Sequence, residues 1–224
     1  MRVMTLVLAA SVAATAVYAQ DADRSVSDGG IKVSGWKGRV DRRPASQGKS
    51  VADSKFVEAD GGYRLSVGPA AFYWNPSNTV SGNYEVKATF KEHKMAASHP
   101  HSYGIFIGGK DLESDTEMLM YCIVYGNGTY SVKTFHGSNV TTLVDRAASP
   151  ALHKAGDSGE STNEIGWMVM GGKPACVVNG TTLKTFEKSE VVGADKLAST
   201  DGIYGIRVSH NLELTVTGLK ASKH

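Results

Sequence analysis

The chain has 224 residues, with 24 lysines and arginines against 22 aspartates and glutamates, and its formal net charge is +2. This near balance excludes the strong positive field that nucleic acids or anionic surfaces would require, so we expect neither as a partner. Only two cysteines are present, which excludes a small scaffold held together by many disulfides.

The first residues have the pattern of an export signal. Arg2 provides a short basic region, an apolar stretch follows, and Val17 and Ala19 place small residues where a signal peptidase requires them. The apolar stretch is shorter than the about 20 residues that a membrane-spanning helix needs. We therefore predict a signal peptide over 1–19, cleaved before Gln20, and a periplasmic or extracellular mature chain without a membrane span.

A polar lead-in precedes a single domain. Residues 20–30, QDADRSVSDGG, are polar and end in glycines, as flexible segments do. No internal repeat or shift in composition divides the remainder, and its length suits one β domain of ordinary core size. We predict one domain over 31–219 and a C-terminal tail over 220–224.

Short β patterns separated by Gly, Asn, Asp and Pro fill this domain. No window shows a convincing helical stripe: the best helix candidate, 187–197, is interrupted by Gly193, and the basic segment 37–50 is predicted to be a solvated loop. Many short strands with almost no helix predict an all-β, antiparallel sandwich or barrel. The predicted strands are 31–36, 63–67, 70–74, 83–91, 103–108, 117–125, 129–135, 139–145, 164–170, 174–179, 182–186, 202–209 and 211–218.

Alternation predicts which side chains face the core. In the strand at 83–91, Tyr84 and Phe90 share the apolar face, and in the strand at 103–108 the apolar face includes Tyr103. The stretch LMYCIVY is apolar on both faces, which predicts a central strand that is covered on each side.

Six segments together resemble a known family. They are VGPAAFYWNP (67–76), GNYEVKATFKE (82–92), HPHSYGIFIGGKDL (99–112), YCIVYGNGTYSVKTF (121–135), VVNGTTL (177–183) and DGIYGIRVSHNLELTVTGL (201–219). In this order they are similar to bacterial exported members of the concanavalin A-like, laminin-G-like jelly-roll superfamily, near the 3-keto-disaccharide hydrolase domains.

The resemblance implies an antiparallel two-sheet jelly-roll sandwich whose concave sheet can bind sugars. The chain departs from this subset at one position. Relatives tend to carry an arginine where Tyr125 precedes GNG, so an arginine contact with a ligand would be lost or replaced by an aromatic ring here.

The stretch ESDTE has the spacing of a catalytic strand in one jelly-roll glycoside hydrolase family. Glu113 and Glu117 would have to act as a carboxylate pair, with apolar residues at the intervening positions that face the core. Those positions hold Ser114 and Thr116 instead. We therefore interpret the stretch as a solvated acidic loop rather than as a hydrolase motif.

Three histidines are the candidate metal ligands. His99 and His101 flank Pro100 before a predicted strand, and His210 lies in a turn between the last two predicted strands. Zinc requires three or four ligands, and we expect at most two of these histidines to converge, so no metal site is predicted. Because the resemblance includes both HP and HNL, we hypothesise that His99 lies near His210, and we interpret His101 as a loop residue.

Aromatic rings in the middle strands form a candidate sugar-binding surface, since sugar C–H faces stack on rings while polar neighbours bind hydroxyls. Trp74, at a predicted strand end, is the ring that we expect to be accessible. Arg207 alternates outward, either as a polar partner of a ligand or as a solvated strand residue. The residues predicted to bind a ligand are Trp74, His99, Tyr103, Tyr125, Arg207, His210 and Asn211.

The cysteines and the glycosylation sequons are each open to two interpretations. Cys122 and Cys176 lie in apolar strands, and we favour free buried thiols over a disulfide. Three N-x-[ST] sequons fall in predicted hairpin turns, where they serve turn geometry, and their glycosylation stays open. They begin at Asn127, Asn139 and Asn179.

These patterns predict an exported, non-catalytic carbohydrate-binding module of the cell envelope with a glycan as its partner. One alternative is a glycosidase-like hydrolase related to the 3-keto-disaccharide group. It would need a carboxylate pair facing a groove, which the strands do not provide, so no catalytic residue is predicted. Another alternative is a structural or interaction domain without a small ligand. We predict no cofactor, while a structural calcium ion and the oligomeric state stay open.

Overall fold

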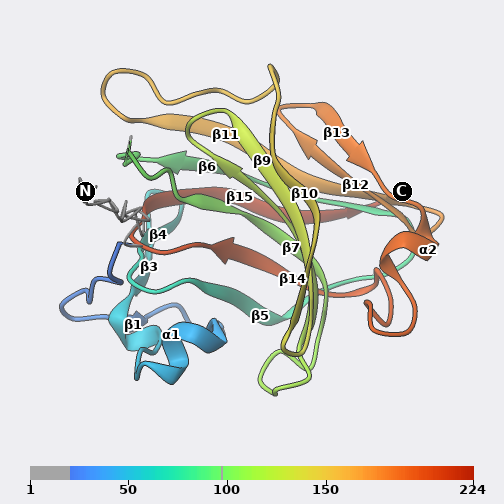
Figure 1. Cartoon of the computed structure of the whole chain (residues 1–224), viewed down its shortest axis with the longest axis horizontal. Coiled ribbons are helices and arrows are strands. Elements are labelled where there is room, and N and C mark those ends of the chain that lie inside the picture. The colour runs from blue at the N-terminus through green and yellow to red at the C-terminus, as the bar shows by residue number, and fades with distance from the viewer. Residues whose placement is uncertain (1–20, 97) are drawn as a thin grey trace, which may run out of the picture.

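Two β-sheets packed face to face form the molecule (Figure 1). The computed structural model describes residues 21–96 and 98–224, so the predicted signal peptide over 1–19 lies outside the described residues. Neighbouring strands are antiparallel, except for the parallel pair β1 and β3. Among the described residues, no helix combines the length and apolar character needed to cross a membrane.

The larger sheet has eight strands and the smaller sheet has seven. In spatial order the larger sheet contains β1 (Gly30–Ile31), β3 (Lys55–Ala59), β4 (Gly62–Ser66), β15 (Glu213–Lys223), β6 (Tyr84–Glu92), β11 (Ser161–Met170), β12 (Lys173–Val178) and β13 (Thr181–Thr185). The smaller sheet contains β10 (Asn139–Ala148), β9 (Thr129–His136), β8 (Met118–Tyr125), β7 (Ser102–Lys110), β14 (Gly202–Val208), β5 (Ala71–Val80) and β2 (Lys37–Val40). The helices are α1 (Arg42–Ser46), the 3₁₀ turn η1 (Val51–Asp53) and α2 (Lys188–Val191).

The core lies between the sheets and follows the predicted alternation. Tyr84 and Phe90 of β6 are fully buried there, as is Tyr103 of β7. Strand β8 is covered on both faces, as predicted, because Cys122 belongs to the core while Tyr121 belongs to a second apolar cluster. The all-β antiparallel sandwich is therefore confirmed.

The second apolar cluster lies on the outer face of the smaller sheet. Loop 111–117 contributes Leu112 to it, and Glu117 of this loop forms ion pairs with Arg39 of β2 and Arg42 of α1. The loop therefore reaches over this face from β8 to β2 and α1 and packs Leu112 against the cluster. The cluster consists of Phe72, Trp74, Phe106, Leu112, Leu119, Tyr121, Ile123 and Phe135.

The N-terminal quarter of the domain differs most from the prediction. The strand expected over 31–36 is absent apart from Ile31, and the loop expected over 37–50 contains β2 and α1. Arg39 and Arg42 of this segment form ion pairs with Asp115 and Glu117 of loop 111–117. These distant partners help to order the segment, and the local sequence does not reveal them. At the other end, β15 continues to Lys223 through the expected tail over 220–224.

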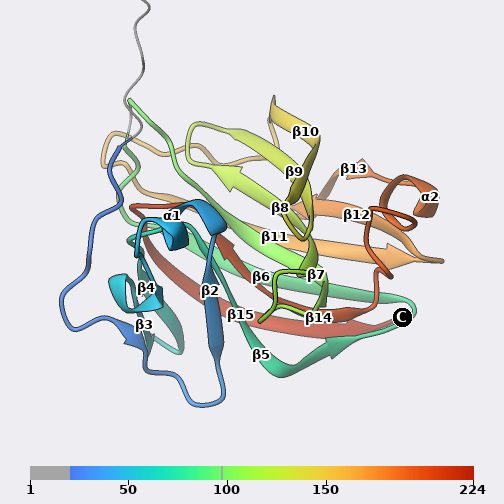
Figure 2. The ribbon, with the colours of Figure 1, turned by 60° about the horizontal axis from the view of Figure 1, so that its bottom comes forward.

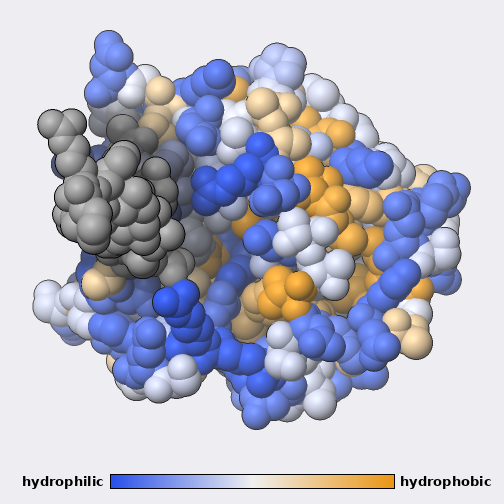
Figure 3. All heavy atoms as spheres, viewed as in Figure 1, coloured by the Kyte–Doolittle hydropathy of each residue, from blue (hydrophilic) through white to orange (hydrophobic). Residues whose placement is uncertain are grey.

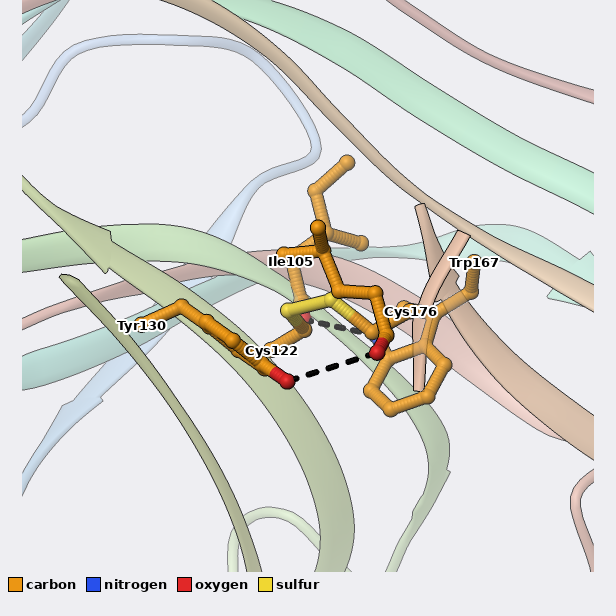
Figure 4. The surroundings of a disulfide bond; sticks show 6 residues. Ile105, Cys122, Tyr130, Trp167 and Cys176 are labelled. Carbon is orange, nitrogen blue, oxygen red and sulfur yellow. Dashed lines mark hydrogen bonds between the residues drawn. A yellow bond between two sulfur atoms is a disulfide. The ribbon is translucent and has the colours of Figure 1, made fainter. Parts of the chain in front are cut away.

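A disulfide joins the two sheets through the core (Figure 4). It links Cys122 of β8 with Cys176 of β12, whose Cα atoms are 6.0 Å apart, so the prediction of free thiols is wrong. The indole of Trp167 packs beside it and donates a hydrogen bond of 3.0 Å to the carbonyl of Ile105. The chain-entropy model gives a bridge across 54 residues a stabilisation of about 4 kcal/mol.

A buried carboxyl group ends β6. Glu92 is 0% exposed, and its Oε1 has no hydrogen-bond partner within the described part of the chain. Its Oε2 accepts a hydrogen bond of 3.4 Å from Ser161, whose hydroxyl also contacts the hydroxyl of Tyr103 at 2.9 Å. Burial raises the pKa of Glu92 to about 7, against the weaker lowering effect of the Ser161 hydrogen bond.

This carboxyl predicts a pH dependence of stability. The unfolded chain releases the Glu92 proton near pH 4.5 and the folded chain holds it to about pH 7, so stability falls as the pH rises through that window. The fall is about 3 kcal/mol at 1.4 kcal/mol per pH unit. Urea unfolding at pH 4.5 and pH 8 measures it: Glu92→Gln should abolish this fall, whereas Glu85→Gln on the outer side of β6 should keep it. An equal fall in both variants would contradict the assignment.

Candidate functional site

One pocket of about 550 Å³ opens on the outer face of the smaller sheet. It lies at the end of the molecule where β7 begins, β14 ends and α1 packs (Figures 1 and 2). Figure 3 shows a hollow near the middle of one face, bordered by both hydrophilic and hydrophobic residues. The lining residues used below are Asp21, Asp23, Asp41, His99, His101, Tyr121, Tyr125, Lys133, Arg146, Arg207 and His210.

An ion pair between a buried arginine and a partly buried aspartate holds the floor of the pocket. Arg207 of β14 donates two hydrogen bonds of 2.6 Å to the two carboxylate oxygens of Asp41, the residue before α1. Its guanidinium carbon also lies 5.1 Å from the centre of the Tyr121 ring. Burial is the largest single effect and lowers the pKa of Arg207, but the attraction of Asp41 and Tyr121 and their hydrogen bonds together outweigh it and raise the pKa, so the guanidinium is charged. Of the two interpretations of Arg207, the solvated strand residue is therefore wrong.

The other aromatic ring of the floor is covered by an arginine as well. The guanidinium carbon of Arg146 in β10 lies 4.4 Å from the centre of the Tyr125 ring. The resemblance implied that an arginine at position 125 was replaced by an aromatic ring. In the structure a guanidinium nevertheless lies over this position, supplied by Arg146 of β10, two strands away from β8.

All three candidate histidines meet at the rim of the pocket. One ring nitrogen of each lies within 4.8 Å of the others, and the ring centres of His101 and His210 are 4.4 Å apart. The hypothesis that His99 lies near His210 is confirmed by a distance of 6.2 Å between their ring centres. The expectation that at most two would converge is wrong, and His101 is a buried residue, only 4% exposed, rather than a simple loop residue.

The environment keeps one of these histidines neutral. Burial lowers the pKa of His101 to about 4, and the neighbouring His210 and His99 add to the effect. Its Nε2 has no hydrogen-bond partner in the described part of the chain, and the nearest carboxylate oxygen, of Asp21, is 4.0 Å away. A neutral imidazole with a free ring nitrogen is able to bind a proton donor or a metal ion.

The predicted lead-in forms one wall of the pocket. The side chain of Arg24 donates hydrogen bonds to the carbonyls of Val67 (2.8 Å) and Leu212 (2.7 Å). Asn211 accepts a hydrogen bond from the backbone of Arg24 at 3.0 Å and donates one to Ala22 at 3.0 Å. These contacts place Asp23 where its carboxylate contacts Nδ1 of His210 at 2.8 Å.

The structure divides the predicted ligand-binding residues. His99, Tyr125, Arg207 and His210 line the pocket. The other three do not: Trp74 is only 2% exposed and lies in the second apolar cluster, so its predicted accessibility is wrong, while Tyr103 is buried between the sheets. Asn211 fastens the lead-in instead of lining the pocket.

Sequence reasoning missed several pocket residues. Asp41 and Arg146 lie outside the six segments that carry the family resemblance. Only the fold brings Asp41 to Arg207 of β14 and Arg146 to Tyr125 of β8. The alternation of side chains along β8 could have placed Tyr121 on the outer face, because it points away from the core residue Cys122. The acidic stretch ESDTE is absent from the pocket lining, and Glu117 is buried at 3% exposure, so the solvated-loop interpretation does not hold for this residue.

No protein-family model matches the chain, and no curated protein matches its sequence. Solved structures match it at low identity. The carbohydrate binding module CBM66 from Bacillus subtilis aligns with a TM-score of 0.57 and 7% identity, over 86% of this chain and 98% of that chain. The chain has a jelly-roll fold.

Two further jelly rolls are similar. A protein of unknown function with a galectin-like fold from Bacillus subtilis has a TM-score of 0.56 and 13% identity, over 84% of this chain and 89% of that chain. A variant of alginate lyase A1-II′ has a TM-score of 0.53 and 15% identity, over 87% and 96%. At these identities the likeness is one of fold. It confirms the jelly roll, and these matches do not confirm the narrower resemblance to 3-keto-disaccharide hydrolases.

The Arg207–Asp41 pair predicts a large effect on stability. Asp41→Asn leaves the buried guanidinium without its counter-charge, which should lower the free energy of unfolding by about 3–5 kcal/mol. Asp195→Asn, an exposed carboxylate change, should alter it by less than about 0.5 kcal/mol. Denaturant titration measures both. The double variant Asp41→Asn, Arg207→Met should recover part of the loss, and a single-variant loss no larger than the control would contradict a buried charged pair.

Proposed function

We propose that this protein is an exported carbohydrate-binding jelly roll that takes a saccharide into the pocket at the end of its smaller sheet. The observation that carries the proposal is the pocket itself. Its volume of about 550 Å³ lies within the about 300–1,000 Å³ typical of small-molecule sites. It is lined by hydroxyl, guanidinium, imidazole and carboxylate groups. CBM66, by its name a carbohydrate binding module, shares the fold.

Directed hydrogen bonds, rather than ring stacking, are the proposed mode of binding. The rings of Tyr121 and Tyr125 are only 3% and 6% exposed. Guanidinium groups of Arg207 and Arg146 lie over them. A sugar in this pocket therefore meets polar edges, where hydroxyl groups find donors and acceptors in fixed positions.

The charge of one wall favours an acidic saccharide. Lys133 of β9 and Arg146 of β10 both line the pocket, and neither forms an ion pair with a carboxylate within residues 21–96 and 98–224. Arg207, in contrast, is neutralised by Asp41. A carboxylate on the ligand, as in a uronic acid, would complement the cations on β9 and β10 through charge-assisted hydrogen bonds.

Export is part of the proposal and has two supports. The sequence of residues 1–19 has the pattern of a signal peptide, and the Cys122–Cys176 disulfide suits an oxidising compartment. The intact mass of the protein recovered from the cell envelope or medium should correspond to a chain that begins at Gln20 and lacks two hydrogens relative to the dithiol. A mass that retains residues 1–19, or two thiols that react without reduction, would contradict it.

A hydrolase related to the 3-keto-disaccharide group is the second candidate. It is favoured by the buried His101 and Tyr121, two groups able to exchange protons beside a ligand. A mechanism with two carboxylates is less suited to the pocket, because Asp41 is held by Arg207 and Asp23 by His210. A turnover assay separates this candidate from binding alone.

A glycan array that contains neutral and uronate-bearing oligosaccharides tests the proposal, with a release assay on each glycan bound. Binding of acidic glycans without release supports a binding module, and release supports the hydrolase. Failure to bind or release any glycan would overturn both candidates and leave a structural or interaction domain.

The basic wall gives a sharper expectation. Lys133→Met should weaken binding of the acidic glycan by about tenfold, or about 1.4 kcal/mol, with little change in melting temperature. Lys220→Met, an exposed change on β15 of the larger sheet, should leave the affinity unchanged. Isothermal titration measures both variants. Equal affinities for the two would show that the carboxylate is bound elsewhere or that the charge is irrelevant.

A further inference from the structure

We propose that His99, His101 and His210 form a binding site for a divalent transition metal such as Zn²⁺, with one coordination position open to the pocket. This inference does not depend on the saccharide, because it rests on the arrangement of the three imidazoles and their neighbours.

The distances suit a shared ion. Zinc bonds of about 2.0–2.1 Å at tetrahedral angles place ligand nitrogens about 3.3 Å apart. The candidate ligand nitrogens lie within 4.8 Å of one another, so side-chain rotations of His99 and small adjustments of the other two rings would be needed to reach that spacing. His99 is exposed in the segment before β7, while His101 and His210 are buried and fix the position of the site.

An unpartnered nitrogen is the second observation. His101 is 4% exposed, and its buried Nε2 has no hydrogen-bond partner within the described residues. A buried polar atom without a partner destabilises the fold, so native structures seldom retain one without a use. Its neighbours are two other imidazoles, which suits coordination to a common ion.

Asp23 orients a second ligand. Its carboxylate accepts a hydrogen bond of 2.8 Å from Nδ1 of His210, which leaves Nε2 as the nitrogen that would bind a metal ion. Metal-bound histidines commonly have such a carboxylate partner on the other ring nitrogen. Arg24 and Asn211 hold the segment that carries Asp23. In the proposed site these contacts would therefore also fix the orientation of His210 through Asp23.

The donor set selects the class of metal. Three imidazole nitrogens favour zinc and its neighbours, whereas calcium prefers six to eight oxygen ligands. Three protein ligands leave a position for water or for a ligand oxygen, as in sites that act on or bind small molecules. Because all three histidines line the pocket, that position faces the space proposed for the saccharide.

Direct metal titration tests the proposal. The protein, prepared without a histidine tag and stripped with a chelator, is titrated with Co²⁺ and then with Zn²⁺ at neutral pH. We expect one Co²⁺ per chain with the visible absorption of a low-coordinate nitrogen site, displaced by one equivalent of Zn²⁺. Less than a tenth of an equivalent of either metal would overturn the proposal.

Variants locate the site. His101→Gln and His210→Gln should abolish the Co²⁺ absorption, and the exposed change His99→Ala, which is expected to fold normally, should weaken it strongly. Asp23→Asn should reduce affinity about 10–100-fold without abolishing the absorption. His136→Gln, at the far end of β9, is the control and should have no effect. Unchanged absorption in folded His99→Ala and His210→Gln would place the metal elsewhere and overturn the assignment.

The glycan array, run with and without chelator, keeps the two proposals separate. Glycan binding without metal binding would refute only the metal site, and metal binding without any glycan would refute only the saccharide.

Discussion

The ion pair between Arg207 and Asp41 is the constraint on which the site depends. It joins the middle of the smaller sheet to the segment that carries β2 and α1, through two hydrogen bonds of 2.6 Å in a buried position. The pair tolerates little displacement, because separation would leave the buried guanidinium of Arg207 without its counter-charge. Once Asp41 is fixed on β14, α1 must stand beside the sheet and form a wall of the pocket (Figure 2).

The position of the pocket follows from what is closed elsewhere. The middle of the outer face, the usual place to seek a ligand on such a sheet, is filled by the second apolar cluster under loop 111–117. That loop is held down by Arg39 and Arg42, whose charges meet Glu117. Access is left at one end, where the lead-in, the segment before β7 and the turn after β14 converge. The pocket at this end is lined mainly by polar side chains, whereas the apolar side chains of the outer face belong to the second apolar cluster.

The predictability of the fold and of the site differed for physical reasons. Alternation within β6, β7 and β8 identified the core because side-chain direction in a strand is a local property. The pocket depends on pairs far apart in the chain, such as Arg207 with Asp41 and Asp23 with His210. Periodicity carries no information on such partners. The burial of Trp74 was not predictable for the same reason, since its apolar cluster includes Phe106 and Leu112 from other parts of the sequence.

Taken together, the two proposals assign different roles to the two sides of the pocket: one side carries cations, and the other carries the three histidines. The cations Lys133 and Arg146 lie on β9 and β10, whereas the three histidines come from the segment before β7 and the turn after β14. A metal ion at the histidines would be a second positive centre, partly balanced by Asp21 and Asp23 on the lead-in. A ligand that carries a carboxylate at one end and hydroxyl oxygens at the other would satisfy both centres at once. A neutral sugar would contact only the metal and its hydrogen-bonding neighbours. The cations on β9 and β10 would therefore set the preference for acidic over neutral saccharides. The metal would fix the position of the bound saccharide along the pocket.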